Sequence, residues 1–295
     1  KINWCMNKKK ILVGFIGQGF IGKSMADDFE DRGYKIVRYS KNGFSANKEK
    51  IAECDFVFIA VPTPSTPKGF DDSILLEVIK LIGDGKTVVI KSTIKIGTTE
   101  KLQKLYPKKF IIHSPEFLTE KNAKNDARFP ERNIVGYTKK SFKVAKDVLE
   151  LLPKAKHNFI VPCREAELTK YMGNTFLMLK VVFANVIFNL AKAKKLNYDK
   201  VCEMVGYDSR IGHSHLQIKH QGGLAGKVGR GAGGHCFIKD MAALVEMYKE
   251  SNLIDKQSKL ALNFLESAVS LNNQLLLDSQ KDLDLLFGVY GKIKK

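Results

Sequence analysis

Short apolar runs alternate with longer stretches of helical spacing in the first half of the chain. Seven runs between residues 11 and 162 are rich in β-branched and aromatic residues, and they read ILVGFI, YKIVRYS, CDFVFIAV, TVVIKS, KFIIHS, RNIVG and HNFIVP. Runs of this kind predict β-strands. Because helical patterns separate them, we expect a doubly wound α/β fold in which helices cover both faces of a parallel sheet.

The pattern changes after Arg164. Apolar residues then recur at helical spacing over residues 165–195, 200–205 and 239–272, with no strand-like run between them. A glycine-rich segment, residues 222–234, interrupts this helical part. We therefore expect an α/β domain over residues 7–163, an all-helical domain over residues 164–275 and a C-terminal tail over residues 276–295.

Composition limits the classes of function. The five cysteines lie far apart and form no CxxC pair, which argues against a disulfide framework or a structural zinc site and favours a reducing, cytoplasmic setting. The longest apolar stretch, residues 176–191, is broken by Lys180 and Asn185 and is shorter than a membrane span, so we expect no membrane partner. The net charge of +18 comes mostly from dispersed lysines without interleaved aromatic residues, which favours a solvated basic surface over a nucleic-acid site.

A glycine motif follows the first strand-like run directly. It reads GQGFIG, with Gly17, Gly19 and Gly22 at GxGxxG spacing, and a helical pattern comes next. In this context the first glycine permits a tight turn, the second lets a pyrophosphate approach the backbone, and the third allows close helix packing. The start of the helix, at Phe20 and Ile21, offers unpaired amides to an anion. The motif therefore predicts a Rossmann domain that binds NAD or NADP.

The end of the second strand-like run leaves the choice of cofactor open. An acidic residue usually binds the ribose hydroxyls of NAD at this point, but the sequence here is Arg38-Tyr39-Ser40-Lys41. Ser40 with Lys41 or Arg38 could accept the 2′-phosphate of NADP. In the other interpretation, Ser40 and the backbone hold the unphosphorylated ribose of NAD.

Five further motifs follow in order along the chain. They are AVPTP at residues 60–64, KSTIKIGTT at 91–99, SPEFLTE at 114–120, EAELTKYMGNTFLMLKVVFAN at 165–185 and GGHCFIKD at 233–240. Together they resemble the UDP-glucose/GDP-mannose 6-dehydrogenase family over residues 17–272. The resemblance implies oxidation of the C6 alcohol of a nucleotide sugar, a UDP-sugar, to a carboxylate. It implies two hydride transfers to NAD and a covalent thioester on a cysteine.

Cys236 matches the nucleophile of this family. A thiolate adds to the intermediate aldehyde, and a second hydride loss leaves a thioester that water cleaves. The flanking glycines and nearby Lys239 favour a reactive thiolate, because a neighbouring cation lowers the pKa of a thiol. The alternative for Cys236 is a small buried hydrophobic residue.

Other matched residues imply the remaining chemistry. Lys170 and Asn174 are four residues apart on one helical face and match the pair that binds the reacting oxygen and stabilises the alkoxide. Glu120 matches the glutamate that activates the hydrolytic water, and Thr93 and Asp240 match the residues that hold the water and the lysine. Glu116 stands four residues before Glu120 in the same motif.

The remaining matches concern ligand binding. The cofactor-binding residues that we expect are Gly17, Gly19, Phe20, Ile21, Gly22, Ser40, Lys41, Val61, Pro62, Thr63, Thr93, Glu120 and Lys239. The substrate-binding residues that we expect are Phe117, Leu118, Glu120, Lys170, Asn174, Arg210, Arg230 and Gly233. The planar guanidinium of Arg210 suits a phosphate or sugar oxygens. His213 and His215 have no third ligand nearby, so we expect no metal.

The helix that starts near Glu165 also predicts assembly. Its apolar residues occupy more of the helix circumference than one intramolecular contact needs, and they include Leu177, Val181, Phe183, Val186 and Ile187. The resemblance implies pairing through this region, so we expect a homodimer. The alternative is a helix buried wholly within its own subunit.

Two other functions stay open. Family members usually continue into another Rossmann-like domain that completes the nucleotide site, and no such unit follows in this sequence. One alternative is a two-domain β-hydroxyacid dehydrogenase, which carries out a single two-electron oxidation without a cysteine. The other is a non-catalytic, truncated protein that binds NAD or a nucleotide sugar.

Overall fold

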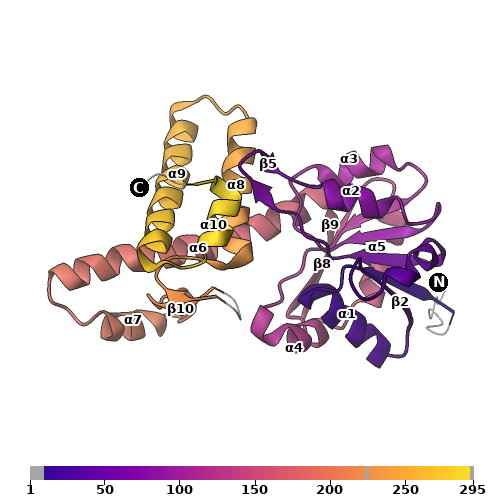
Figure 1. The fold of residues 1–295 in the computed structure, drawn as a ribbon, viewed down its shortest axis with the longest axis horizontal. Coiled ribbons are helices and arrows are strands. Elements are labelled where there is room, and N and C mark those ends of the chain that lie inside the picture. Colours follow the sequence, from indigo (N-terminus) through magenta and orange to yellow (C-terminus); the bar gives the residue numbers. More distant parts are fainter. Residues whose placement is uncertain (1–9, 223–225, 293–295) are drawn as a thin grey trace. The chain divides into compact units, whose positions relative to one another are not determined.

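The computed structural model describes residues 10–222 and 226–292 (Figure 1). The chain divides into two compact units. The first unit comprises the described residues up to 63 together with residues 71–170, and the second comprises residues 64–70 with the described residues from 171 onward. The boundary at residue 170 falls inside one long helix, α6 (Cys163–Ala193).

A seven-stranded sheet forms the centre of the first unit, in the order β2-β1-β3-β6-β7-β8-β9. Each strand-like run of the sequence forms one of its strands, which confirms the predicted fold class. The strands are β1 (Leu12–Ile16), β2 (Lys35–Tyr39), β3 (Phe56–Ile59), β6 (Thr87–Ile90), β7 (Phe110–His113), β8 (Arg132–Tyr137) and β9 (His157–Pro162).

One ladder of this sheet departs from the parallel arrangement that we expected. Strand β8 pairs antiparallel with β7, with Ile112 opposite Tyr137, while the other neighbours in the sheet pair parallel. An antiparallel neighbour begins at the sheet edge where the preceding strand ends. The connection through α4 (Ala123–Arg128) therefore brings the start of β8 back to the edge that carries the SPEFLTE motif.

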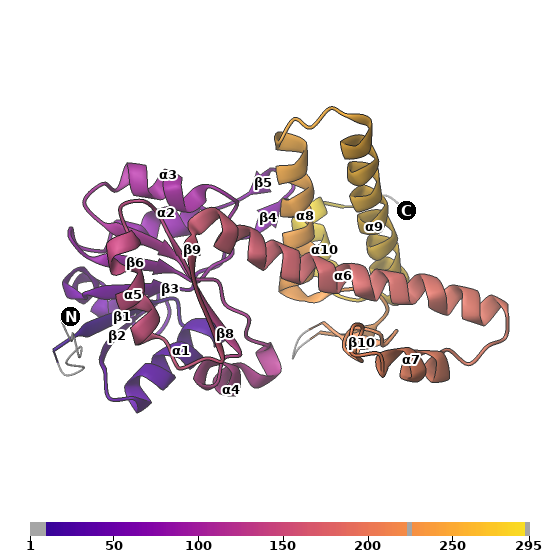
Figure 2. The same ribbon diagram turned by 180° about the vertical axis from the view of Figure 1, so that it is seen from behind.

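Helices cover both faces of the sheet (Figures 1 and 2). Helices α1 (Phe20–Asp31) and α5 (Phe142–Leu151) pack on one face, where Phe15, Phe29 and Phe58 form an aromatic cluster with ring centroids 5.2–5.3 Å apart. Helices α2 (Ser73–Ile79) and α3 (Thr98–Leu105) pack on the other face. Short 3₁₀ turns lie at η1 (Ser45–Asn47), η2 (Glu49–Glu53) and η3 (Glu120–Asn122).

The second unit is mainly helical. Besides α6, it contains α7 (Tyr198–Gly206), α8 (Gly234–Glu250), α9 (Lys256–Ser279) and α10 (Leu283–Tyr290). Two small hairpins accompany them, formed by β4 (Ser65–Thr66) with β5 (Gly69–Phe70) and by β10 (His220–Gln221) with β11 (Val228–Gly229). The described part of segment 276–295, which we expected to be a tail, packs into the unit, because Leu276 and Leu286 are fully buried.

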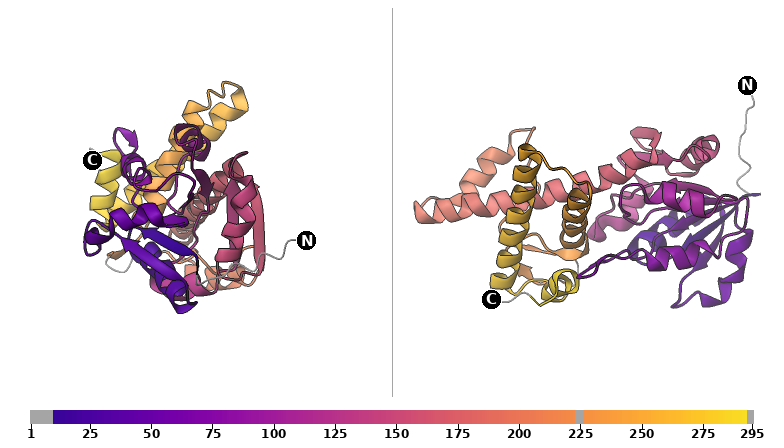
Figure 3. Two further views of the ribbon diagram at one scale, coloured as in Figure 1. Left: turned by 90° about the vertical axis from the view of Figure 1, so that its right-hand side faces the viewer. Right: turned by 90° about the horizontal axis from the view of Figure 1, so that it is seen from above.

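Helix α6 runs without interruption through its 31 residues (Figure 3). Among the described residues it is the one helix with the length and apolarity of a membrane span, with a mean hydropathy of 1.6 over 18 residues, of which 33% are buried. A single helix of this kind is weak evidence for a membrane, since core helices of soluble proteins share its composition.

Candidate active site

The glycine motif forms a tight turn between β1 and α1. Gly17 has a φ of +89°, and a Cβ there would lie 2.2 Å from the carbonyl oxygen of Ala60. A Cβ at Gly22 would lie 1.9 Å from the Gly17 oxygen, so both positions require glycine. A Cβ at Gly19, the N-cap of α1, would meet no atom within 4 Å. Two glycines thus allow close packing, and the third leaves open space above the helix start.

This turn fits the diphosphate of a dinucleotide. The first amides of α1, which include those of Phe20 and Ile21, lie at the positive end of the helix dipole and lack intrahelical acceptors. The adjacent AVPTP segment is hydrogen-bonded to the start of the KSTIKIGTT motif. The Val61 amide donates to Ser92 Oγ at 3.0 Å, and Thr63 Oγ1 donates to the Thr93 carbonyl at 2.7 Å. The structure therefore brings these predicted cofactor-binding segments together.

The cations expected near a 2′-phosphate already have carboxylate partners. Arg38 contacts Asp27 at 2.7 Å and Glu30 at 2.8 Å. Lys41 lies 3.4 Å from Glu77, and Ser40 Oγ donates to the Asn42 carbonyl at 2.5 Å. These pairs reduce the positive charge that the second strand offers to a phosphate.

Lys170 is buried and points at the SPEFLTE motif. Its ammonium donates to the Glu116 carbonyl at 2.7 Å and to Glu116 Oε1 at 3.1 Å, and both side chains are less than a tenth exposed. The other carboxylate oxygen of Glu116 accepts the Leu118 amide at 2.7 Å. Glu120, which the resemblance placed in the water-activating role, is exposed. The carboxylate beside Lys170 is therefore Glu116, for which the resemblance implied no role although Glu116 and Glu120 share the four-residue spacing.

A second buried lysine lies next to this pair. Lys91 donates to Ser114 Oγ at 3.1 Å and to the Pro115 carbonyl at 3.4 Å. Burial lowers the pKa of Lys91 to about 8, with Glu116 acting in the opposite direction. Burial also lowers the pKa of the adjacent His113 to about 3. One carboxylate is thus shared electrostatically by two buried ammonium groups.

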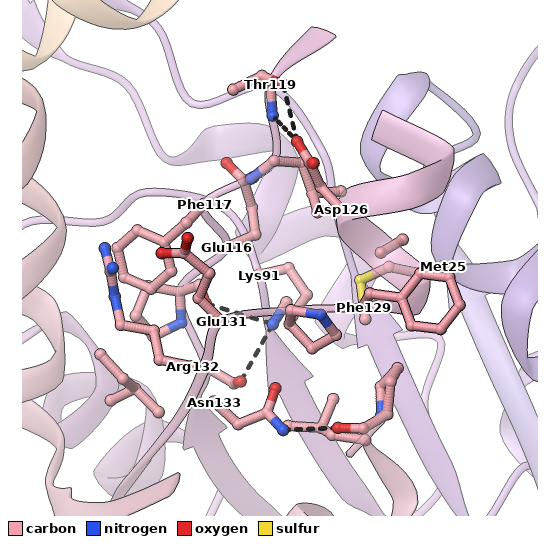
Figure 4. A pocket seen from close by; sticks show the side chains of 18 residues that line it. Met25, Lys91, Glu116, Phe117, Thr119, Asp126, Phe129, Glu131, Arg132 and Asn133 are labelled. Atoms are coloured by element: carbon pink, nitrogen blue, oxygen red, sulfur yellow. Dashed lines mark hydrogen bonds between the residues drawn. The ribbon is translucent and has the colours of Figure 1, made fainter. Parts of the chain in front are cut away.

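A cavity of about 330 Å³ opens in the first unit beside this cluster (Figure 4). One wall includes Phe117, whose ring centroid lies 3.9 Å from the guanidinium carbon of Arg132. Another wall includes Thr119 and Asp126, whose carboxylate accepts the Thr119 amide at 2.8 Å. Both walls come from the sheet edge that β7 and β8 share. Three expected ligand-binding residues, Phe117, Leu118 and Lys170, therefore lie at or beside one concave surface of the first unit.

In the second unit, Cys236 lies in the first turn of α8. It is the exposed one of the four cysteines in the described residues, so the alternative of a buried hydrophobic residue is wrong. Cys54 and Cys163 are buried, and burial raises the pKa of both thiols to about 12. Exposure at a helix N-terminus is the setting in which a thiol reacts.

A polar network lies one turn further along α8. Asp240 is almost fully buried, and its two carboxylate oxygens accept from Asn174 Nδ2 and from the Lys239 ammonium, each at 2.5 Å. Asp240 follows Cys236 by four residues, so both side chains belong to one face of the helix. Asp240 thus forms hydrogen bonds with both Asn174 and Lys239. Because the Lys239 ammonium is paired with Asp240, its effect on the pKa of the Cys236 thiol is reduced.

The two expected substrate arginines have partners within the second unit. Arg210 is exposed and pairs with Asp208 at 2.6 Å, and Arg230 donates to Asn185 at 2.8 Å and to Asn189 at 2.7 Å. Gly233 is the N-cap of α8. Over the described ranges, no cluster of three or more His, Cys, Asp or Glu side chains could hold a metal ion.

The expected catalytic residues are divided between the two units. Thr93, Glu120 and Lys170 belong to the first unit, and Asn174, Cys236 and Asp240 belong to the second. Each unit assembles its own part: a buried Lys170–Glu116 pair in the first, and the Asn174–Asp240–Lys239 network beside Cys236 in the second.

Comparisons with known proteins agree with this architecture. The UDP-glucose/GDP-mannose dehydrogenase family matches residues 35–152 with its NAD binding domain and residues 164–274 with its central domain. A putative UDP-glucose 6-dehydrogenase of Bacillus subtilis is 32% identical over 74% of this chain and 52% of its own length. A UDP-glucose 6-dehydrogenase of the same organism is 31% identical over 97% of this chain and 67% of its own length. A solved UDP-glucose dehydrogenase of Pyrobaculum islandicum superposes with a TM-score of 0.75 at 25% identity, covering 92% of this chain and 72% of that one.

A Rossmann-type NAD-binding domain followed by a helical central domain is the arrangement that these family models describe, and it defines the class of protein. The chain belongs to the UDP-glucose/GDP-mannose dehydrogenase family. It spans between about half and two thirds of the length of the two Bacillus subtilis relatives.

Proposed function

We propose that the chain oxidises the C6 alcohol of a UDP-sugar to a carboxylate through a thioester on Cys236. The observation that carries this proposal is the exposed Cys236 at the N-terminus of α8, one turn before the buried Asp240 that binds Asn174 and Lys239. Bound NAD, held by the glycine turn and the AVPTP segment, supplies an acceptor for the hydride released in each of the two oxidations.

Cys236 performs the covalent step. Its thiolate, favoured by the positive end of α8, adds to the C6 aldehyde, so a carbon–sulfur bond forms and the carbonyl electron pair moves onto oxygen, which takes a proton. After the second oxidation, water attacks the thioester carbon, the carbon–sulfur bond breaks, and sulfur leaves as the thiolate. The products are the carboxylate and the regenerated cysteine.

Lys170 and Asn174 are the proposed donors to the reacting oxygen. They stand on successive turns of α6 and offer an ammonium and an amide, which stabilise negative charge as the alcohol loses its proton. Glu116 accepts two hydrogen bonds from the Lys170 ammonium, one at its carbonyl oxygen and one at its carboxylate, and so fixes the direction of the ammonium. Asp240 has the same positioning role toward Asn174.

NAD is the proposed cofactor, rather than NADP. Arg38 is engaged by Asp27 and Glu30, and the Lys41–Glu77 pair places a further carboxylate at the end of the second strand. A 2′-phosphate there would have to displace one of these carboxylates or lie beside it, which like-charge repulsion disfavours.

The test follows acid formation and reduced cofactor with UDP-glucose as the probe. The parent protein should form two equivalents of NADH for each acid. Cys236→Ser should form no acid while NAD still raises its melting temperature, and Cys202→Ser, at a half-buried cysteine, should match the parent. Acid production by the Cys236→Ser variant would overturn the thioester mechanism. One equivalent per substrate would identify the simpler β-hydroxyacid dehydrogenase, and ligand binding without NADH would identify a binding protein.

A further inference from the structure

The glycine-rich segment that leads into α8, residues 228–234, is held by side chains from the end of α9. Asn272 accepts the Ala232 amide at 2.7 Å and donates to the Ala232 carbonyl at 3.0 Å, so it satisfies both main-chain groups of that residue. Ser279 Oγ accepts the Arg230 amide at 2.9 Å. The segment immediately before Cys236 is therefore bound through its backbone to side chains of α9 that lie 40 and 49 positions later in the sequence.

The turn between α9 and α10 continues this contact with two charged residues. Lys281 is fully buried, and its ammonium donates to the Gly231 carbonyl at 2.8 Å. Asp282 is 9% exposed, and its Oδ2 accepts the Gly234 amide at 2.8 Å. Gly234 is the first residue of α8 and precedes Cys236 by two. A buried carboxylate thus occupies the N-terminal amide of the helix whose first turn carries the cysteine.

Backbone conformation brings these side chains into place. Gln280 and Asp282 have φ values of 49° and 51°, which are left-handed and uncommon for residues other than glycine. Such conformations persist where the surrounding contacts enforce them. The turn therefore directs the adjacent Lys281 and Asp282 side chains toward the same segment.

The glycines opposite leave room for the side chains of this turn. A Cβ at Gly233 would lie 2.0 Å from Asp282 Oδ2, and a Cβ at Gly222 would lie 1.9 Å from the same atom. A Cβ at Gly229 would lie 2.8 Å from the Ser279 Cβ. The absence of side chains lets Asp282 reach the Gly234 amide.

We propose that Lys281 and Asp282 are positioning residues that hold the first turn of α8 and set the charge around the Cys236 thiol. The proposal rests on the proposed function only in taking Cys236 as the reactive cysteine. The Asp282 carboxylate offsets the positive end of the helix dipole and opposes ionisation of the thiol, whereas the Lys281 ammonium opposes the effect of Asp282. The two charges therefore affect thiolate formation in opposite directions.

The experiment measures the rate of Cys236 alkylation by iodoacetamide as a function of pH, quantified on the Cys236 peptide, without cofactor or substrate. Asp282→Asn keeps an acceptor for the Gly234 amide but removes the charge, so the apparent pKa of Cys236 should fall by about half a unit or more. Burial lowers the pKa of Lys281 to about 8, so its ammonium is present over the lower part of the profile. Lys281→Met keeps the apolar stem but removes this cation, so the pKa of Cys236 should rise. Ser279→Ala removes a hydrogen bond to the same segment without changing charge, so it should leave the pKa at the parent value.

Shifts of opposite sign in the two charge variants, with none in the control, would establish the proposal. Coincident pH profiles of alkylation for Asp282→Asn and the parent would overturn it. Equal shifts of the Cys236 pKa in all three variants would also overturn it, because they would reflect a general loss of packing around the first turn of α8. If Lys281→Met does not fold, Asp282→Asn against Ser279→Ala decides the matter. Because no substrate is present, this result is independent of whether Cys236→Ser still forms acid.

Discussion

Glu116 and Glu120 show what a single residue's position adds to its sequence context. Both occur in one motif at a spacing of four, yet Glu116 is buried against Lys170 whereas Glu120 is exposed. The spacing identified the two carboxylates, and the resemblance selected Glu120. Burial of Glu116 depends on Lys170, which is 54 residues away, so no local pattern could reveal it.

Lys91 gives a residue-scale prediction on stability. Its pKa in the folded protein is lowered from the ordinary 10.5 to about 8 by burial. Between these values the unfolded chain binds more protons than the folded one, so the free energy of unfolding rises with pH. The penalty of the buried ammonium is fully present below pH 8 and is relieved as pH rises above it.

The measurement is urea unfolding at pH 7.5 and pH 9.5 for the parent and for Lys91→Met. The parent should gain about 2 kcal/mol relative to the variant over this interval. The difference between the two proteins cancels the titration of the buried Cys54 and Cys163, whose raised pKa acts in the opposite direction above pH 9. A pH-independent difference would show that Lys91 titrates alike in the folded and unfolded chains.

Elements were predictable where the pattern of the chain is local. The seven strand-like runs form the seven strands of the main sheet, because each is a short apolar segment bounded by polar residues or glycine. The direction of β8 was not predictable, because it depends on how the short helix α4 returns the chain. The same holds for Glu167 of α6, which accepts the amides of Gly97 and Thr99 at 2.6 and 2.8 Å and so caps α3 across 68 or more residues.

The glycine turn gives a prediction at the scale of an element. Gly17→Ala places a Cβ 2.2 Å from a backbone oxygen at a φ of +89°, so it should destabilise the fold by about 2 kcal/mol or more. Gly19→Ala places its Cβ in open space, so stability should change by less than about 0.5 kcal/mol. That space is where the diphosphate approaches the backbone, so the stabilisation by NAD should nevertheless be lost.

Melting temperatures with and without NAD separate the two effects. Gly33→Ala is the matched control, because Gly33 also has a positive φ, of +84°, but lies outside the motif and meets no atom within 4 Å. It should show the backbone strain alone and keep the response to NAD. An undiminished NAD response in Gly19→Ala would contradict the proposed diphosphate site.

At the scale of the whole molecule, the sequence predicted the members of the site better than their grouping. The motifs gave Lys170, Asn174 and Cys236, but the boundary at residue 170 separates Lys170 from Asn174 although both lie on α6. The hairpin β4–β5 joins the second unit although both flanking segments belong to the first. Such grouping arises from contacts between distant segments, and hydrophobic periodicity carries no information on those contacts.

The assembly of the protein also depends on the whole molecule, and helix α6 is the feature that bears on it. Large apolar side chains of α6 form an exposed stripe along the helix at spacings of four and seven residues: Leu168, Met172, Phe176, Phe183 and Leu190, each 47–69% exposed. Of the residues named from the sequence, Val181 is fully buried within the subunit, whereas Phe183 and Val186 are exposed. The apolar residues of α6 therefore lie on two sides of the helix, as the sequence predicted, and one of these sides is exposed. A continuous apolar stripe of this length is uncommon on a monomer, which supports a homodimer formed through α6.

Substitution within the stripe tests this dimer. Phe176→Lys combined with Phe183→Lys places two positive charges at positions that would be buried on association, so it should weaken dimerisation by tenfold or more, because a buried charge without an opposite partner is costly. Leu105→Lys is the control, at an equally exposed apolar residue of α3, and it should leave the mass of the dimer in solution unchanged. Light scattering across micromolar concentrations is the measurement. A monomeric mass for the parent throughout would exclude the dimer, and an unchanged dimer in the double variant would move the interface away from α6.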